Sequence, residues 1–207
     1  MSRLLIIATA LLIITGCSNP ASDKPQAVTN EAVPVAQTSP APQGERYRIT
    51  TENSQITFVA SKVTRSHHGS FKKFSGVIAF NAQPETSTVN VTIETNSIEA
   101  DDPGLTKHLQ TPDFFDVAKY PQATFTSTTI KAGGAGGATH TVTGNLKMHG
   151  VTKSITFPAT IAVTPNAITV DSTFSINRKD FGINYAGAAD NLIRDEVVLT
   201  LKVRGEK

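Results

Sequence analysis

Histidine, the side chain best suited to metal binding and to proton transfer near neutral pH, occurs five times in this sequence. The positions are His67, His68, His108, His140 and His149. His67 and His68 are adjacent, and adjacent side chains on a strand point to opposite faces, so these two do not readily share an ion. No His-x-Glu pair and no pair four residues apart has the spacing of a zinc site. The histidines therefore predict no metal site and no metal cofactor.

Motifs of nucleophilic and phosphoryl-transfer chemistry are also missing from the sequence. It contains no nucleophile elbow, no Walker loop and no close pair of carboxylates on a helix. The glycine-rich run Gly133–Gly137 lacks the following lysine and Ser/Thr that a phosphate loop requires, and it is typical of a hairpin tip. A triad assembled from residues far apart in the sequence stays open, but no motif supports it. We therefore predict a protein that is not an enzyme and has no catalytic residues.

A cationic group forms the first candidate for a polar ligand contact. It consists of Arg65, His67, His68, Lys72 and Lys73. Cationic donors of this kind bind the carbonyl oxygen or the pyrophosphate group of a ligand. A solvated hairpin surface is the alternative; it is the preferred interpretation for the lysines, whereas both interpretations stay open for Arg65 and His67.

A second polar group is segment 178–182, Arg-Lys-Asp-Phe-Gly, which follows a predicted strand ending at Ile176. An arginine–carboxylate pair over Phe181 would hold a turn of the chain here, which favours a structural corner. A contact from Phe181 to a ligand is the alternative.

The N-terminus has the features of a bacterial lipoprotein leader. Arg3 precedes an apolar run, Leu4–Ile14, that is too short for the roughly 20 residues needed to span a bilayer. Ile14-Thr15-Gly16-Cys17 resembles a lipobox, in which the thiol of the sole cysteine receives a diacylglyceryl group, with acyl chains such as palmitate. We expect residues 1–17 to be the signal peptide and Cys17 to be the site of lipidation. Ser18 then favours the periplasmic face of the outer membrane, and the mature chain has no thiol for a disulfide or for catalysis.

Composition separates a tether from a folded domain. Residues 18–45 are rich in Pro, Ala, Ser, Thr and Gln without apolar periodicity, which predicts a disordered tether. The formal charge is +2, and loss of Arg3 with the leader leaves +2 − 1 = +1. A domain so close to neutral has no electrostatic footprint for nucleic acid. We expect one folded domain over residues 46–205.

From Tyr47 onward the apolar residues recur with a period of two. The run Ile155–Val163 and the set Val197, Leu199, Leu201 and Val203 are the clearest cases. This pattern is typical of antiparallel strands with one dry face and one wet face. Turn signals divide it into about eight strands, enough for a closed barrel, although a sandwich fits the same alternation. Pro158 interrupts one strand, so we expect a bulge or a local gap in pairing there.

Two helical signals interrupt the strands in segment 101–118. Asp101 and Asp102 are candidate N-caps before Pro103, and Leu105 and Leu109 lie four residues apart. The second signal repeats this order with Thr111 and Pro112, followed by Phe114, Phe115 and Ala118 on one face. These two short helices are expected to bury their apolar side chains at one end of the sheet.

Alternation also gives a candidate set of inward-facing side chains. The residues are Phe58, Phe74, Phe80, Val91, Phe125, Leu146, Phe157, Ile161 and Phe174, with Leu109, Phe114 and Phe115 closing one end. A solid core accounts for the same alternation. Small Ala, Thr and Ser side chains beside ten Phe and no Trp favour a tunnel instead.

Several segments together resemble the YceI-like family. They are Lys107-His108-Leu109, Pro112–Asp116, Lys119-Tyr120-Pro121, Ala123–Thr128, Gly144-Asn145-Leu146, Gly150–Lys153 and Arg178–Ile183. They occur in the family's order, and the resemblance covers roughly Tyr47 to Gly205. It departs from the family at Ser70-Phe71-Lys72-Lys73, which puts any head-group preference in doubt.

The resemblance implies an all-β, eight-stranded, lipocalin-like antiparallel barrel, with one or two short helices closing an end. It also implies a long isoprenoid lipid, a polyprenyl chain or a prenyl quinone, held in the interior by the inward residues and Phe181, without a further cofactor. Its partners would be this lipid and, through Cys17, the membrane; a homodimer stays open. The alternatives are a stress-response or interaction protein with a filled barrel, and a hydrolase or metal protein built on the same shell.

Overall fold

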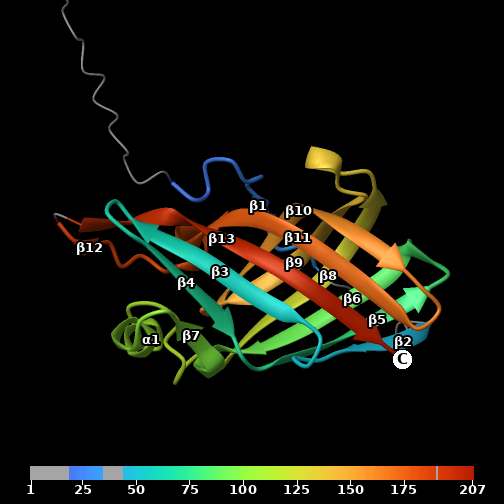
Figure 1. Cartoon of the computed structure of the whole chain (residues 1–207), viewed down its shortest axis with the longest axis horizontal. Helices are drawn as coiled ribbons and strands as arrows, with labels where there is room; N and C mark the ends of the chain where they lie inside the picture. Colours follow the sequence, from blue (N-terminus) through green and yellow to red (C-terminus); the bar gives the residue numbers. More distant parts are fainter. Residues whose placement is uncertain (1–18, 35–43, 190) are drawn as a thin grey trace, which may run out of the picture.

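The described part of the chain is built from antiparallel strands with little helix (Figure 1). The computed structural model describes residues 19–34, 44–189 and 191–207. The predicted leader, including Cys17, lies outside the described residues. No helix among the described residues is long and apolar enough to cross a membrane.

The bounds of the elements are as follows. The strands are β1 Val28–Glu31, β2 Glu45–Ile49, β3 Gln55–Lys62, β4 Ser66–Phe71, β5 Phe74–Asn81, β6 Gln83–Glu94, β7 Ile98–Ala100, β8 Gln122–Ala132, β9 His140–Met148, β10 Val151–Val163, β11 Ala167–Asn177, β12 Gly187–Ala188 and β13 Asn191–Glu206. The helix is α1 Pro103–Leu109, and three short 3-10 segments are η1 Thr95–Ser97, η2 Ala135–Gly137 and η3 Arg178–Phe181.

Eight of these strands close into a ring. The hydrogen-bonded order is β2-β5-β6-β8-β9-β10-β11-β13, and β13 pairs with β2 again, so the sheet returns to its starting strand. Every pair in the ring is antiparallel. The closed barrel confirms the predicted fold class, which the period of two alone left open between a barrel and a sandwich.

Strand register places the apolar alternation on the inside of this barrel. Phe125 on β8 lies opposite Val91 on β6 and Leu146 on β9. All three face the same interior, because directly opposed residues in antiparallel strands share a face. Outward positions such as Asn90 and Lys147 are exposed. The core of the protein is therefore the interior of the barrel.

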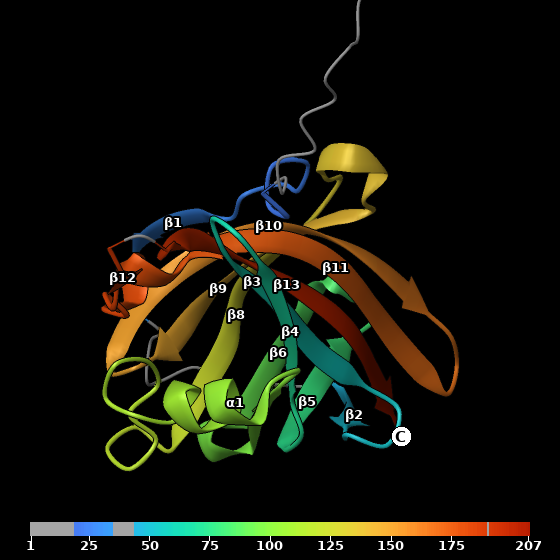
Figure 2. The ribbon, with the colours of Figure 1, turned by 60° about the vertical axis from the view of Figure 1, so that its left-hand side comes forward.

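One end of the barrel carries a second layer. Along its length, β13 pairs first with β3, which continues through β4 to β7, and then with β2 near the C-terminus. Helix α1 follows β7 and lies at the end of the barrel opposite the β5–β6 and β10–β11 turns (Figures 1 and 2). This arrangement fixes α1 over one opening.

Helix α1 begins where the sequence predicts, but the second helical signal gives turns instead of a helix. Asp102 caps α1, because its Oδ1 accepts a hydrogen bond from the backbone N–H of Leu105 at 2.7 Å, with Pro103 in the first turn. After α1 the backbone N–H of Asp116 donates to the carbonyl of Thr111, and Asp116 adopts a φ of 44°. This left-handed conformation stops a second helix from propagating.

The N-terminal segment departs from the expectation of a disordered tether over residues 18–45. Residues 28–31 form strand β1, which pairs antiparallel with residues 153–156 of β10. Ala21 and Ala27 are buried. The composition of this segment predicts disorder because it has no apolar periodicity, whereas its placement depends on backbone hydrogen bonds to an available strand edge. Residues 18 and 35–43 of the predicted tether lie outside the described residues.

The structure also explains Pro158. Strand β10 pairs with β1 over residues 153–156 and with β11 only from Thr160 onward. Pro158 lies between these two pairings, while its pairing with Thr141 on β9 continues without a register shift. The predicted local gap in pairing is present on the β11 side, where the missing N–H of proline leaves no donor unpaired.

Candidate functional site: an apolar cavity in the barrel

The barrel contains a cavity of about 200 Å³, counted as the space available to the centres of water-sized spheres. Every lining residue except Arg178 is apolar. A lone water needs only about 10–15 Å³ on this measure and two to four polar partners. The cavity is therefore wide enough for a ligand, and its wall favours hydrocarbon over water. The filled interior that a solid core requires is not observed.

Most of the residues predicted to face the lumen line this cavity. They are Phe58, Val91, Leu109, Phe114, Phe115, Phe125, Leu146, Phe157, Ile161 and Phe174. Three predicted residues do not line it. Phe74 is buried in the surrounding core, Phe80 borders a separate void of about 10 Å³, and Phe181 is completely buried on η3. Phe181 thus has a packing position, and the corner interpretation describes it better than a ligand contact.

Close approach of aromatic rings to glycine helps to shape the wall. A Cβ on Gly144 would lie 2.4 Å from the ring of Phe125, so only glycine lets this ring lie flat along the neighbouring strand. The same relation holds between Gly69 on β4 and Phe58 on β3, because a Cβ on Gly69 would lie 2.2 Å from the Phe58 ring. In both pairs the absence of a side chain gives the phenylalanine space along the wall, so the ring need not fill the centre of the barrel.

Arg178 is the one charged residue on the cavity wall, and its side chain is 5% exposed. Its guanidinium donates to the carbonyls of Ile183 (2.7 Å) and Arg194 (3.1 Å), and to Asp195 Oδ1 at 3.2 Å. Burial lowers the pKa of Arg178 below its usual range, and the carboxylate of Asp195 opposes that shift. The arginine–carboxylate pair proposed for this segment is present, but its partner comes from β13.

Aromatic side chains close the α1 end of the cavity. Leu109, Phe114 and Phe115 contribute to the lining there. Tyr185 contacts the rings of His108 and Phe114, with centroid distances of 5.1 and 5.4 Å. His108 Nε2 also lies 2.7 Å from Asp113 Oδ2. Tyr185 was not among the residues selected from the sequence, since its position depends on the loop after η3 meeting α1.

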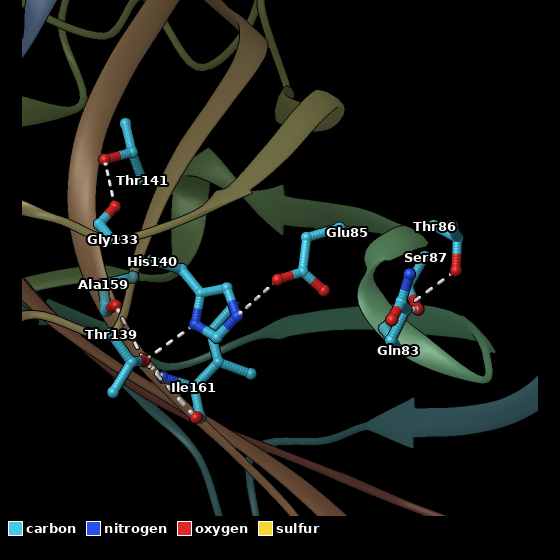
Figure 3. Close-up of polar contacts among 10 residues, drawn as sticks. All are labelled: Gln83, Glu85, Thr86, Ser87, Gly133, Thr139, His140, Thr141, Ala159 and Ile161. Carbon is cyan, nitrogen blue, oxygen red and sulfur yellow. Dashed lines mark hydrogen bonds and ion pairs between the residues drawn. The ribbon is translucent and has the colours of Figure 1, made fainter.

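The opposite end is closed by polar contacts (Figure 3). His140 on β9 faces Glu85 on β6 at this end, with 3.5 Å between Nε2 and Oε1. The hydroxyl of Thr139 lies 2.7 Å from His140 Nδ1 and accepts from the backbone N–H of Ile161 at 2.9 Å. Ser87 Oγ donates to the carbonyl of Gln83 at 2.6 Å. These contacts join three separate strands beneath the apolar cavity.

The predicted polar rim does not line the cavity. Arg65 is exposed in the turn between β3 and β4, and Lys72 makes an exposed ion pair with Glu99 at 3.5 Å. His67 Nδ1 lies 2.8 Å from Asp101 Oδ1, and the backbone N–H of His68 donates to the same carboxylate at 3.1 Å. These residues join β4 to the start of the α1 segment, which favours the interpretation as a hairpin surface.

The contact between Asp101 and His67 predicts a pH-dependent contribution to stability. The hydrogen bond from His67, followed by that from the backbone of His68, lowers the pKa of Asp101 below 3.8. A lowered carboxyl pKa gives stability that is present above the unfolded pKa and lost as pH falls through the folded value. Asp101→Asn should lower the free energy of unfolding by about 1 kcal/mol at pH 7, because the side chain is partly exposed.

Urea unfolding at pH 7, 5 and 3 measures this contribution. The difference between the wild type and Asp101→Asn should shrink as the pH falls below 3.8. Asp171→Asn on the exposed face of β11 is the matched control and should change little at any of these pH values. An undiminished difference at pH 3 would contradict the assignment.

Within residues 19–34, 44–189 and 191–207, no group of three or more His, Cys, Asp or Glu side chains is placed to hold a metal ion. The five histidines are distributed over the two ends of the barrel and the β3–β4 hairpin. The buried charge of Arg178 is tied to backbone carbonyls and Asp195. The arrangement is suited to holding an apolar molecule.

A closed antiparallel barrel around an apolar cavity defines a lipocalin-like class of protein. Within that class, the chain belongs to the YceI-like family, because the YceI-like domain profile matches residues 47–204. A UPF0312 protein of Pseudomonas putida is 37% identical over 172 residues, which cover 78% of this chain and 86% of the relative. Protein YceI of Salmonella arizonae is 45% identical over 93 residues, 44% of this chain and 47% of that protein.

Solved structures show the same fold. BcnA of Burkholderia cenocepacia superposes with a TM-score of 0.67 at 28% identity, covering 75% of this chain and 98% of BcnA. The YceI protein of Campylobacter jejuni gives a TM-score of 0.59 at 30% identity, covering 67% and 84%. A polyisoprenoid-binding domain from Saccharophagus degradans gives 0.62 at 20% identity, covering 77% and 97%. At that identity the last similarity shows the fold alone.

Proposed function

We propose that this protein binds and carries a long isoprenoid-type lipid, a polyprenyl chain or a prenyl quinone, in the barrel cavity and performs no chemistry on it. The observation that carries the proposal is the cavity of about 200 Å³ whose wall is apolar except for Arg178. Membership of the YceI-like family supports the same class of ligand. Native mass spectrometry of the purified protein would identify the bound lipid.

The physical basis is transfer of a hydrocarbon tail from water into the cavity. Each buried methylene contributes about 0.8 kcal/mol, so a tail of several isoprene units gains enough to offset the costs of association and ordering. Branched methyl groups and flat double bonds suit a wall made of phenylalanine and β-branched side chains. Binding by this mechanism needs no charged contact, which is consistent with the sparse polar lining.

Native mass spectrometry and lipid extraction of freshly purified protein test the proposal. We expect a copurifying lipid with a prenyl tail, and uptake of an added prenyl quinone by protein stripped of lipid. Protein that is consistently empty and also fails to take up prenyl quinones would overturn the proposal. A straight-chain fatty acid of matched carbon number is the control that separates isoprenoid binding from general lipid binding.

We further propose that Cys17 is acylated and holds the barrel at the periplasmic face of the outer membrane. The sequence Ile14-Thr15-Gly16-Cys17 and the following Ser18 support this proposal. Mass spectrometry of the mature N-terminus is expected to find a diacylglyceryl group on Cys17. An unmodified thiol or cleavage at another residue would contradict the anchor.

A further inference from the structure

The wall of the barrel has a seam between β10 and β11. These strands pair directly only over residues 160–163 of β10. On the N-terminal side of Thr160 the two strands no longer pair with each other. Where they separate, Ser172 Oγ donates to the carbonyl of Pro158 at 2.5 Å. A second short pairing, of two residue pairs, joins β13 to β2, and most of β13 pairs with β3 instead. The seam between β10 and β11 is completed by the N-terminal segment.

Residues 25–34, here called the strap, fill the seam. On one side the backbone N–H of Ala27 donates to the carbonyl of Ser175 at 2.8 Å, and the N–H of Ser175 donates to the carbonyl of Pro25 at 2.9 Å. On the other side β1 pairs with residues 153–156 of β10. The strap is therefore bonded to both edges of the seam, and Figure 2 shows β1 along β10 on the outside of the barrel.

The cavity lies directly behind the strap. Phe157 on β10 and Phe174 on β11 stack face to face across the seam, with ring centroids 4.2 Å apart and planes 9° apart. Both rings line the cavity. Phe174 immediately precedes Ser175, to which the strap is bonded, and Phe157 follows the part of β10 that pairs with β1. Release of the strap would thus free one edge of each of these two strands, while their other edges stay paired with β9 and β13.

The strap is held mainly by backbone hydrogen bonds at the surface. Ala27 is its one buried side chain, and Val28 is 59% exposed. Two exposed side-chain contacts fix its far end. Asn145 exchanges hydrogen bonds with the backbone of Val33 at 2.7 and 3.1 Å, and Lys153 pairs with Glu31 at 2.6 Å. Segments with few buried apolar contacts and exposed hydrogen bonds open before the rest of a fold.

The contacts at the two ends of the barrel involve its own strands and the cavity lining. The α1 end is covered by the packed side chains of Leu109, Phe114 and Phe115, and the other end by the contacts around Thr139 and His140 (Figure 3). Opening either end would disrupt several strands or the lining itself. Opening the seam requires the strap to detach and the stacked rings of Phe157 and Phe174 to part, while the remaining strand pairings of the ring stay in place.

We infer that the strap is a releasable closure over a lateral portal, through which a lipid tail enters and leaves the cavity between Phe157 and Phe174. This inference rests on the proposed function, because it assigns a route to the same ligand. If Cys17 is acylated, seven residues lie between the anchor and Pro25, and the eight Cα-to-Cα steps reach at most roughly 29 Å. The anchor would then hold the portal beside the membrane from which the lipid comes.

A reversible lock on the strap tests the portal. Val28 and Thr156 are directly opposed partners, so cysteines at these positions lie within disulfide range. The full chain with Cys17→Ser, Val28→Cys and Thr156→Cys is loaded with radiolabelled geranylgeraniol, and its release to phospholipid vesicles is timed before and after reduction. Release from the oxidised protein should be at least about tenfold slower than from the reduced protein.

Matched variants control for general stiffening and for the α1 end. Thr124→Cys with Lys147→Cys places a disulfide across the continuous β8–β9 wall, where reduction should leave the release rate within about twofold. Tyr185→Ala loosens the aromatic contacts at the α1 end and should also leave the rate within about twofold. Asn145→Ala should speed release by about threefold, and Asn90→Ala, an exposed asparagine on β6, should not.

The possible outcomes separate the portal from the proposed function. Equal release rates from the oxidised and reduced strap lock, with lipid bound in both states, would overturn the portal and leave lipid binding intact. Faster release from Tyr185→Ala together with an unaffected strap lock would place the route at the α1 end instead. A chain that takes up no geranylgeraniol in either redox state would overturn both the portal and the proposed function.

Discussion

Replacing Ala123 by tryptophan should raise the dissociation constant for a prenyl quinone by about 100-fold. Ala123 lies on β8, is 3% exposed and lines the cavity. The indole would occupy space that three or four carbons of the tail fill, and each of them contributes about 0.8 kcal/mol. The loss of about 2.7 kcal/mol corresponds to that factor in affinity.

The matched control is Ala162→Trp on the exposed face of β10, which should bind as the wild type does. The chain has no tryptophan of its own, so each variant carries a single indole that can be excited selectively over its three tyrosines. Any quinone that still binds should quench the fluorescence of the indole at position 123 and leave that of the indole at position 162 unchanged.

Overpacking costs about 1–3 kcal/mol, so circular dichroism must first show that the Ala123→Trp variant is folded. Val91→Trp, at a partly buried lining position on β6, supplies a second obstruction should the first variant not fold. A folded variant of either kind that retains wild-type affinity would contradict binding inside the barrel.

The sequence predicts the inward face of the barrel well because alternation is a local property of each strand. Phe125, Leu146 and Phe157 line the cavity as their parity requires. Phe80 has the correct parity but lies too near one end, beside a separate void, where it packs edge to face with Tyr47 at 6.1 Å. Parity gives the face of a residue, and its height along the barrel depends on strand stagger, which the sequence does not encode locally.

Other features depend on contacts between distant segments. The partner of Arg178 is Asp195, which the β11–β13 register brings alongside, whereas the motif itself offers only the nearby Asp180. The ordered N-terminal segment escapes prediction for a related reason. Its side chains carry almost no apolar signal, and its position is set by free backbone groups on β10 and β11 that exist only once the barrel has formed.

The hollow interior is the least predictable feature from residue types alone. A packed core and a lined cavity share the same alternation, and they differ only in whether side chains meet across the centre. Here Gly69 and Gly144 give Phe58 and Phe125 space along the wall, a relation between neighbouring strands that requires the register to be known. The hollow interior is predicted from the family resemblance and not from the periodicity.

Replacing Arg178 by methionine should lower the free energy of unfolding by about 3–5 kcal/mol, the largest stability effect expected in this chain. The guanidinium donates to the carbonyls of Ile183 and Arg194 and to Asp195, and the methionine side chain has no donor to replace these hydrogen bonds. The two carbonyls would then lie near an apolar cavity without this donor, and an unsatisfied buried acceptor costs about 1–3 kcal/mol, whereas Asp195 keeps its ion pair with Lys179. Arg178→Lys should restore little, because a single ammonium does not reproduce the fork of donors.

Lys179→Met is the matched control, since it removes the neighbouring cation that pairs with the same Asp195 at 2.9 Å. The Lys179 side chain is 48% exposed, so its loss should cost at most about 1 kcal/mol. Urea midpoints for the two variants, with unchanged m-values, measure the difference. A loss below about 1 kcal/mol for Arg178→Met would mean that water or lipid satisfies those carbonyls, and Arg178 would then be free to contact a ligand.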